Sequence, residues 1–388
     1  MPKILTIFGT RPEAIKMAPL VTALKRQPEY ETVVAVSAQH REMLDQVLGL
    51  FHISPDYDLD IMRHGQSLTQ VTSRVLNGLE EVIVKEQPDM ILVHGDTTTT
   101  FVAALAGYYQ QTAVGHVEAG LRTGNKYSPY PEEMNRRLAG ALTDLHFAPT
   151  DEARDNLLAE GTAPDKIFVT GNTVIDALLT TVDKRFQFAD PVLEELTASG
   201  KKFLLLTAHR RENWGKPMAR IFRAVKRLAD NHPEMAVVFP VHKNPRVRQL
   251  AHEILGGHAG VVLIEPLDYQ PFANLMDRSQ LVLTDSGGMQ EEAPSLGKPV
   301  LVLRDTTERP EAVVAGTVRL VGTDEEKIFR QAEKVLTDPD EYAQMAQATN
   351  PYGDGQACKR IIQCLDYYFG LRSEQPMEFN YSGEIGKY

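Results

Sequence analysis

Short, continuous apolar runs recur along this chain, and most of them are followed by a segment with the apolar spacing of a helix. Such a run suits a strand that is covered on both faces, as the strands of a parallel sheet are. Residues 3–8, 90–94 and 281–284 are clear instances. Because strands and helices alternate, the sequence predicts an α/β protein built on parallel, doubly wound sheets.

The alternation runs once along the first part of the chain and then starts again. A chain of 388 residues is too long for one ordinary core, so two α/β domains are expected. We predict that the first domain spans residues 1–171 and that the second begins at residue 172. Weak patterning from 178 to 200 marks the region between them. The other predicted strands are 32–38, 112–117, 145–148, 167–170, 203–207, 237–240, 261–264, 300–303 and 318–321.

The composition excludes several classes of function. A formal charge of −11 with no basic block argues against a nucleic-acid partner. No secretory segment is visible, and no apolar stretch approaches the roughly 20 residues that span a membrane. Cys358 and Cys364 do not face each other on the helix predicted at 356–368, so we expect reduced thiols and a cytoplasmic protein. The Cys/His spacing of a zinc site is absent.

Residues 281–292 read as a buried strand, a tight glycine turn and the first turn of a helix. Asp285 and Ser286 can cap the helix, and the two glycines after them allow a ligand to approach the backbone. Free amides at a helix start favour a phosphate, while Glu291 or Glu292 could accept hydrogen bonds from ribose hydroxyls. The stretch therefore suggests a bound nucleotide diphosphate. A plain N-capped helix after a strand is the alternative.

Polar residues gather where the predicted strands end, which is where open α/β sheets bind ligands. His209 and two arginines follow one such strand and would clamp a diphosphate. Asp96 and Glu118 could hold a ligand or cap the next helix. Glu132 lies in the first turn of a helix, where acids are also favoured without any function. The residues at strand ends are Arg11, Lys16, His94, Asp96, His116, Glu118, His209, Arg210, His242, Asp285, Ser286 and Arg309.

One tetrapeptide occurs twice, at residues 11–14 and 309–312, each time just past a predicted strand. Both copies put an arginine, Arg11 or Arg309, at a helix entrance where a phosphate is favoured. The alternative is that two helices begin with the same four residues by chance.

At these residues the chain resembles the non-hydrolysing UDP-N-acetylglucosamine 2-epimerases, and it does so along nearly its whole length. Seven stretches match in the order of the family, and together they are far more specific than any one of them. They are residues 8–19, 94–97, 116–122, 131–136, 209–213, 285–292 and 304–311.

The resemblance implies the architecture of the B-type glycosyltransferases, with two Rossmann-like domains facing across a cleft. The last helix would cross back, so that residues 365–388 join the first domain and 172–364 form the second. It also implies the interconversion of UDP-N-acetylglucosamine (UDP-GlcNAc) and UDP-N-acetylmannosamine (UDP-ManNAc) without NAD, any other cofactor or a metal. A homodimer and a role in cell-surface polysaccharide synthesis are further expectations of the family.

Carried over by match, two sets of residues have roles in this reaction. Four residues would surround the sugar: Lys16, Asp96, Glu118 and Glu132. These four residues and His209 are the catalytic candidates. The UDP ligands implied by the resemblance are Arg11, Lys16, His209, Leu267, Phe272, Ser286, Gly287, Gly288, Glu292 and Arg309.

The C2 proton of the sugar is not α to a carbonyl group, so its direct removal would be very slow. Elimination of UDP from C1 together with that proton gives a glycal, and re-addition after protonation of the other face gives the epimer. Inversion needs acids or bases on two faces, and departing UDP needs positive charge and amides. Which acid serves which face stays open among Asp96, Glu118 and Glu132. Domain closure over the intermediate is expected.

Bacterial members of the family are activated by UDP-GlcNAc bound beside the catalytic pocket. The matching positions in this chain are Gln39, Glu42, Glu132, Arg210 and His242. The sequence departs from the family at Gly65, where an arginine is expected, and Arg63 is a possible substitute.

Three other functions compete with the epimerase. A hydrolysing 2-epimerase would release UDP and free N-acetylmannosamine, and a UDP-sugar glycosyltransferase would share the fold. The acids around the sugar and the lack of an apparent acceptor platform argue against the transferase. A non-catalytic UDP-sugar sensor would keep residues 286–292 but lose Asp96 and Glu118, and both are present.

Overall fold

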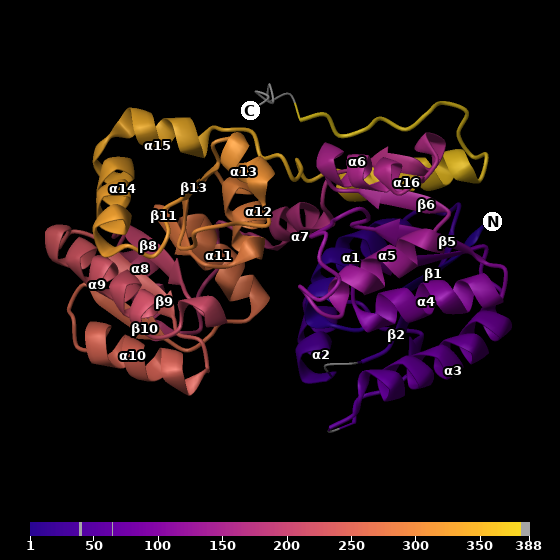
Figure 1. Cartoon of the computed structure of the whole chain (residues 1–388), viewed down its shortest axis with the longest axis horizontal. Coiled ribbons are helices and arrows are strands. Elements are labelled where there is room, and N and C mark those ends of the chain that lie inside the picture. The colour runs from indigo at the N-terminus through magenta and orange to yellow at the C-terminus, as the bar shows by residue number, and fades with distance from the viewer. Residues whose placement is uncertain (39–40, 64, 382–388) are drawn as a thin grey trace. The chain divides into compact units, whose positions relative to one another are not determined.

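The computed structural model describes residues 1–38, 41–63 and 65–381. They form two compact units, the first made of Met1–Thr180 and Tyr352–Asn380 and the second of residues 181–351 with Tyr381. In Figure 1 the first unit runs from indigo to magenta and includes the yellow helix near the C-terminus. Each unit is a parallel sheet with helices packed on it, so the predicted α/β class is confirmed.

The first unit contains a seven-stranded sheet in which every strand is parallel to its neighbours. In order across the sheet, the strands are β3 (Tyr57–Asp58), β2 (Glu31–Val36), β1 (Lys3–Phe8), β4 (Met90–His94), β5 (Ala113–Val117), β6 (Leu145–Ala148) and β7 (Ile167–Val169). The helices of this unit are α1 (Arg11–Lys25), α2 (Arg41–Leu50), α3 (Leu68–Glu86), α4 (Thr98–Tyr109), α5 (Glu132–Ala141), α6 (Asp151–Ala159), α7 (Thr173–Thr181) and α16 (Ala357–Tyr368).

The second unit contains a six-stranded parallel sheet. Across the sheet the strands are β10 (Val261–Ile264), β9 (Ala236–Pro240), β8 (Phe203–Thr207), β11 (Leu281–Thr284), β12 (Val300–Val302) and β13 (Val318–Leu320). Its helices are α8 (Pro191–Ala198), α9 (Lys216–Asn231), α10 (Pro245–Leu255), α11 (Tyr269–Arg278), α12 (Gly287–Ser295), α13 (Pro310–Val314), α14 (Glu325–Thr337) and α15 (Pro339–Ala346).

Both sheets have the same topology, apart from the extra strand β7 in the first. In each sheet the first strand lies in the middle, and the order turns back between β1 and β4 and between β8 and β11. In doubly wound sheets the connections leave in opposite directions at such a point, and the crevice that opens there binds the ligand. Each unit therefore has one favoured ligand-binding edge.

Every strand predicted from the sequence is present, with ends that differ by no more than a few residues. The sequence missed β3, because two residues are too short to show a period. The region of weak patterning at 178–200 contains the end of α7 and the whole of α8.

The C-terminal helix α16 packs within the first unit, as the crossing-back helix was expected to. Asp176 of α7 accepts hydrogen bonds from the backbone N–H groups of Ala357 and Cys358 and so caps α16 (3.1 and 2.9 Å). The hydroxyl of Tyr30 donates to Asp366 at 2.7 Å. Cys358 and Cys364 are both buried free thiols, as predicted.

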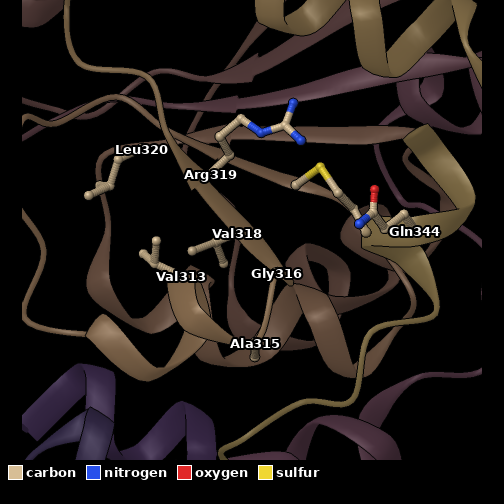
Figure 2. A pocket seen from close by; sticks show the side chains of 8 residues that line it. Val313, Ala315, Gly316, Val318, Arg319, Leu320 and Gln344 are labelled. Atoms are coloured by element: carbon tan, nitrogen blue, oxygen red, sulfur yellow. The ribbon is translucent and has the colours of Figure 1, made fainter. Parts of the chain in front are cut away.

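Strand β13 forms an edge of the second sheet, and a cavity of about 410 Å³ lies beside it. Figure 2 shows small apolar side chains of α13 and β13 around this cavity, with Gln344 of α15 nearby. Its charged residue, Arg319, already pairs with Glu341 and donates to Gln331 (2.9 Å). The lining contains no acid, histidine or nucleophile, so we do not assign a site there.

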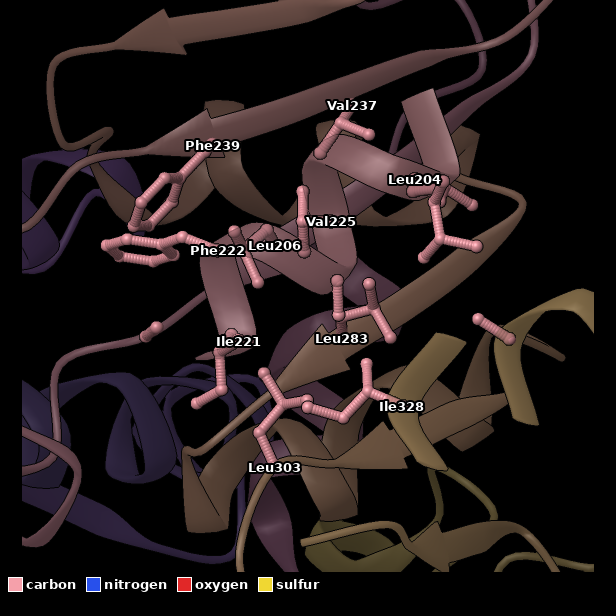
Figure 3. Packing of buried hydrophobic residues seen from close by; sticks show 14 of the residues in the cluster. Leu204, Leu206, Ile221, Phe222, Val225, Val237, Phe239, Leu283, Leu303 and Ile328 are labelled. Carbon is pink, nitrogen blue, oxygen red and sulfur yellow. The ribbon is translucent and has the colours of Figure 1, made fainter. Parts of the chain in front are cut away.

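The second unit has a hydrophobic core between its sheet and helices α9, α10 and α14. Figure 3 shows the rings of Phe222 and Phe239 packed together, with centroids 5.4 Å apart, and Ile328 of α14 on the other side of the cluster. A separate core in the first unit joins its sheet to α3 and α4. No helix in the described part of the chain is both long and apolar enough to cross a membrane.

Candidate active site

Glu13 organises the ligand-binding edge of the first sheet. Its buried carboxylate accepts from the N–H groups of Gly9 and Thr10 after β1 (3.0 and 2.7 Å). It also accepts from the hydroxyls of Thr97 and Thr100, which follow β4 (2.6 and 3.1 Å). One side chain thus holds together the two turns that flank the point where the strand order reverses.

Gly9 lets the turn after β1 approach Ser37, which follows β2, and Thr99 of α4. A Cβ at this position would lie 1.9 Å from Ser37 Oγ and 2.8 Å from Thr99 Oγ1. The next residues start α1, with Thr10 at the N-cap and Glu13 completing a capping box. Arg11 is therefore the first residue of a 15-residue helix and lies partly exposed at the sheet edge.

Glu118 lies directly after β5 and is surrounded by polar groups. Its backbone has φ +63°, a left-handed conformation that is uncommon outside glycine and is found at functional sites. Oε2 pairs with the ammonium group of Lys16 from α1 and accepts from Asn172 Nδ2 at 2.8 Å. Glu118 does not cap the next helix, α5, because Pro131 takes that position.

His94, at the end of β4, also faces this acid, with Nε2 4.0 Å from Glu118 Oε2. Burial lowers the pKa of His94 to about 3, so the ring is neutral and the contact is not an ion pair. Neither ring nitrogen has a hydrogen-bond partner. His116 lies deeper, donates from Nε2 to the carbonyl oxygen of Gly95 (2.7 Å), and has a pKa that burial lowers to about 4.

Asp96 pairs with Arg136 of α5 and lies at the same edge as Glu118. It does not cap α4, because Thr97 takes that position and accepts from the N–H of Thr100 at 3.2 Å. Asn135 Nδ2 holds the carbonyl of Asp96 at 2.9 Å. The acid is thus fixed in position by its side chain and by its backbone.

The neighbouring acids Glu132 and Glu133 differ in a way that their sequence could not show. Glu133 is fully buried and accepts from the N–H groups of Thr123 and Gly124 (3.0 and 3.1 Å), so it anchors the loop before α5. Glu132 begins α5 and is partly exposed, which leaves its carboxylate accessible.

In the second unit, Asp285 has the organising role that Glu13 has in the first. The sequence suggested a helix cap, but its buried carboxylate turns back and accepts from the N–H groups of His209 and Arg210 (both 2.9 Å at Oδ2). It also accepts from Asn213 Nδ2 at 3.1 Å. The end of β8 is therefore held against the end of β11, beside the reversal point of this sheet.

His209 is partly exposed above this carboxylate, with Nδ1 3.3 Å from Asp285 Oδ1. Its ring stacks on His242 at a centroid distance of 5.6 Å. Burial lowers the pKa of His209, and the Asp285 carboxylate opposes that shift. Arg210 reaches Glu308 at 3.1 Å, and Glu308 in turn pairs with Arg304 at 2.5 Å.

The turn from Ser286 to Gly288 enters α12 with its backbone amides at the sheet edge. Ser286 is the N-cap residue but makes no capping side-chain bond, contrary to the simple capping interpretation. A Cβ on Gly287 would meet Glu308 Oε1 at 2.6 Å, and one on Gly288 would lie 3.4 Å from Glu292 Oε1. A side chain at position 287 would therefore displace the Glu308 carboxylate, whereas the distance at position 288 is an ordinary van der Waals contact.

Glu292 lies near the first turn of α11, where Phe272 is also found. Burial raises the pKa of the Tyr269 hydroxyl well above its usual value, and the nearby Glu292 carboxylate adds to that shift. Leu267 precedes this helix and, like Phe272, is partly buried. The structure thus brings Leu267, Phe272 and Glu292 into one region of the second unit.

Arg309 pairs with Glu291, which is buried, so the two acids of the 281–292 stretch have different surroundings. The repeated tetrapeptide does not give two equal helices: α1 has 15 residues, whereas α13, after Arg309, has five. A helix of one turn adds little dipole, so Arg309 would act on an anion chiefly through its own charge.

The proposed activator positions are described only in part. Gln39 lies outside the described residues, and the side chain of Glu42 is not described either. Gly65 has φ +71° and open space around the position of a Cβ. Arg63 donates to the carbonyls of Asp60 and Met62 (3.0 and 2.6 Å), within its own loop.

Sequence reasoning missed two residues at this edge. Glu13 could have been found, because Thr10 and Glu13 have the spacing of a capping box. Asn172 follows the predicted strand at 167–170 and thus fits the strand-end rule that selected the others. Among the described residues, no group of three or more His, Cys, Asp or Glu side chains could hold a metal ion.

The two parallel sheets have one topology, and polar residues lie at the reversal point of each. In the second unit, the turn into α12 also offers backbone amides to a phosphate. These features are typical of a nucleotide-binding α/β protein. Comparison with known proteins gives the family. The family model described as UDP-N-acetylglucosamine 2-epimerase matches residues 22–366, and the chain belongs to this family.

Individual relatives resemble this chain over nearly its full length. The UDP-N-acetylglucosamine 2-epimerase of Bacillus subtilis is 59% identical over 97% of this chain and 98% of its own. The S. aureus MnaA–UDP co-structure has a TM-score of 0.88 at 52% identity, covering 98% of this chain and all of the other. The UDP-GlcNAc 2-epimerase of Neisseria meningitidis bound to UDP-GlcNAc has a TM-score of 0.82 at 50% identity, covering 94% and 99%.

Proposed function

We propose that this chain is an isomerase that interconverts UDP-GlcNAc and UDP-ManNAc through elimination and re-addition of UDP. The observation that carries the proposal is the division of charge between the two sheet edges. The first unit presents Asp96 and Glu118, each ion-paired, and the second presents His209 and the amide turn of α12. Carboxylates suit proton transfer at the sugar, while amides and cations suit a pyrophosphate.

On the nucleotide side, the amides of Ser286–Gly288, together with Arg11, His209 and Arg309, bind the pyrophosphate as it leaves C1. Leu267 and Phe272 contact the uracil ring. Glu292 accepts hydrogen bonds from the ribose hydroxyls.

On the sugar side, one carboxylate removes the C2 proton while the C1–O bond breaks, which gives UDP and 2-acetamidoglucal. A second acidic group then protonates C2 from the opposite face, and UDP re-adds at C1. The candidates for either step are Asp96, Glu118 and Glu132, named in decreasing order of preference and without an assignment of acid to face. Lys16 pairs with the Glu118 carboxylate.

Additional roles follow from the same family. UDP-GlcNAc acts as an activator through Gln39, Glu42, Glu132, Arg210 and His242, the enzyme is a cytoplasmic homodimer, and its product supplies cell-surface polysaccharide synthesis. Because Arg63 is bound to its own loop and Gly65 carries no side chain, we expect substrate activation to be weaker than in relatives with an arginine at that position.

Incubation with UDP-GlcNAc in deuterated water tests the proposal. Epimerisation gives UDP-ManNAc and deuterium at C2 in both nucleotide sugars, detected by NMR. Free N-acetylmannosamine would instead establish hydrolysis, transfer to an added acceptor would establish a glycosyltransferase, and binding without turnover would establish a sensor.

Variants connect this activity to the acids. We expect Asp96→Asn and Glu118→Gln each to reduce turnover by about 100-fold or more, the range typical of acid–base groups. Glu81→Gln, an exposed change on α3, is the matched control and should have wild-type turnover. Full turnover in the Asp96→Asn/Glu118→Gln double variant would rule out the mechanism.

A further inference from the structure

The side chain of Asn172, between β7 and α7, is almost fully buried and lies against Glu118. Its Oδ1 accepts from the N–H of Val174, in the first turn of α7, at 3.1 Å. Its Nδ2 donates to Glu118 Oε2 at 2.8 Å. The amide cannot turn over, because a flip would place NH₂ against an N–H and a carbonyl oxygen against a carboxylate.

The backbone of Asn172 is equally constrained. Its N–H donates to the carbonyl of Tyr352 at 2.7 Å, at the place where the chain returns to the first unit. Gly171, just before it, has φ +83°, and a Cβ there would lie 3.3 Å from Gly353 Cα. Two segments far apart in the sequence thus fix the position from which the amide reaches Glu118.

Glu118 itself needs such support. Its backbone has φ +63°, a conformation that costs energy and persists only when the surrounding structure holds it. Among the described residues, the titratable groups near its carboxylate include Lys16 of α1, His94 of β4 and, deeper, His116 of β5. Lys16 and Asn172 both donate to Oε2, and Oε1 lies on the side of Gly95, the residue before Asp96.

We propose that Asn172 is a positioning residue for the reaction: its amide holds Oε2 of Glu118 so that Oε1 is presented at the edge occupied by Asp96. The inference rests on the proposed function, because it assumes that Glu118 acts on the sugar. Asn172 itself does not touch the substrate. The Asn172 amide donates to the carboxylate and so favours its ionised form. Because the amide is neutral, it adds no charge to the site, whereas a second lysine would.

Two substitutions separate positioning from folding. Asn172→Ser keeps a short acceptor for Val174 N–H but cannot reach Glu118. Asn172→Asp keeps the acceptor and replaces the donor with a second negative charge. Asn156→Asp is the matched control, because Asn156 of α6 likewise donates from Nδ2, to Gly120 O at 3.0 Å, without contacting either acid.

In the full-length protein, we expect Asn172→Ser to lower kcat for UDP-GlcNAc by 10- to 100-fold while KM changes by less than about threefold, since Asn172 lies in the first unit, whereas most of the proposed UDP ligands lie in the second. Asn172→Asp should move the acid limb of the pH–kcat profile to higher pH by about one unit or more. Asn156→Asp should leave both unchanged. Wild-type kcat and an unshifted acid limb in folded Asn172 variants would overturn the proposal.

A second measurement does not depend on activity. The protein is labelled with ¹³C at the glutamate carboxyl carbons and followed by NMR. The Glu118 signal is assigned as the one that is missing from the spectrum of Glu118→Gln. In Asn172→Asp, the titration of this signal should move to higher pH. An unmoved titration would overturn the role of Asn172 even if the enzyme is active. If the wild type does not convert UDP-GlcNAc but the titration moves, the proposed function fails while the hold of Asn172 on Glu118 stands.

Discussion

At the scale of single residues, buried carboxylates do most of the organising in this protein. Glu13 and Asp285 each accept from two backbone N–H groups and from side chains of a neighbouring turn. Neither has the exposure expected of a group that meets substrate. Each instead places the exposed residues beside it, Arg11 in one unit and His209 in the other.

The role of Asp285 can be measured. In Asp285→Ala the N–H groups of His209 and Arg210 lose their buried acceptor, and each unsatisfied donor costs about 1–3 kcal/mol. We expect the affinity for UDP, measured by calorimetry on folded protein, to fall about tenfold or more, because His209 is no longer held at the sheet edge.

Asp324→Ala separates this effect from a loss of stability. Asp324 caps α14 by accepting from Lys327 N–H at 2.9 Å, away from His209. Its loss should cost about 1 kcal/mol of stability and leave the affinity for UDP unchanged. Wild-type affinity in Asp285→Ala would show that His209 does not need this carboxylate.

At the scale of secondary-structure elements, the central strands of the first sheet carry three buried histidines. His116 of β5 is directly opposite His146 of β6, and His94 ends β4. Burial lowers the pKa of His94 and His146 to about 3 and that of His116 to about 4. These strands therefore carry an acid-sensitive element in their core.

The direction of the pH dependence follows from proton binding. In the unfolded chain these histidines take up protons near pH 6.5, whereas in the folded chain they stay neutral until about pH 4 or 3. Stability is therefore fully present above pH 6.5 and is lost as the pH falls from there towards the folded pKa. For each histidine, the free energy of unfolding falls by about 1.4 kcal/mol for every pH unit within this window.

We expect His146→Leu to reduce this loss, so that its urea unfolding midpoint changes less between pH 7 and pH 5 than that of the wild type. The matched control is His252→Gln, since His252 is exposed on α10. An equal change in His146→Leu and in the wild type would show that His146 is protonated in the folded protein.

At the scale of the whole molecule, the described residues include a large hydrophobic core in each unit, and these cores share no residue. The first joins the seven-stranded sheet to α3 and α4, and the second joins the six-stranded sheet to α9, α10 and α14. Stability in such a protein need not be uniform, because each core can open on its own.

A matched pair of substitutions tests this independence. Leu79 of α3 and Leu228 of α9 are fully buried, one in each core, and replacing either with alanine should cost about 2–5 kcal/mol. Hydrogen exchange followed by mass spectrometry should show faster exchange in the first unit for Leu79→Ala and in the second for Leu228→Ala. Faster exchange throughout both units in either variant would mean that they unfold as one.

Much of this architecture could be read from the sequence, because a buried strand needs apolar residues and a strand end leaves polar ones. The runs of β1, β4 and β11 and the residues after them placed both units and most of the candidate site. Family resemblance then supplied roles that spacing alone left open, above all for Glu132.

Local sequence determined which residues form strands, where helices begin and that acids, cations and glycines gather at strand ends. Only the tertiary structure decided which acids are exposed and which are buried in hydrogen bonds to the protein itself. Glu132 and Glu133 are adjacent in the chain, yet one is accessible and the other anchors a loop. Likewise, Asn172 meets Glu118 from 54 residues away. Burial and hydrogen-bond partners are set by what packs on a residue from distant parts of the chain, and a single sequence does not carry that information locally.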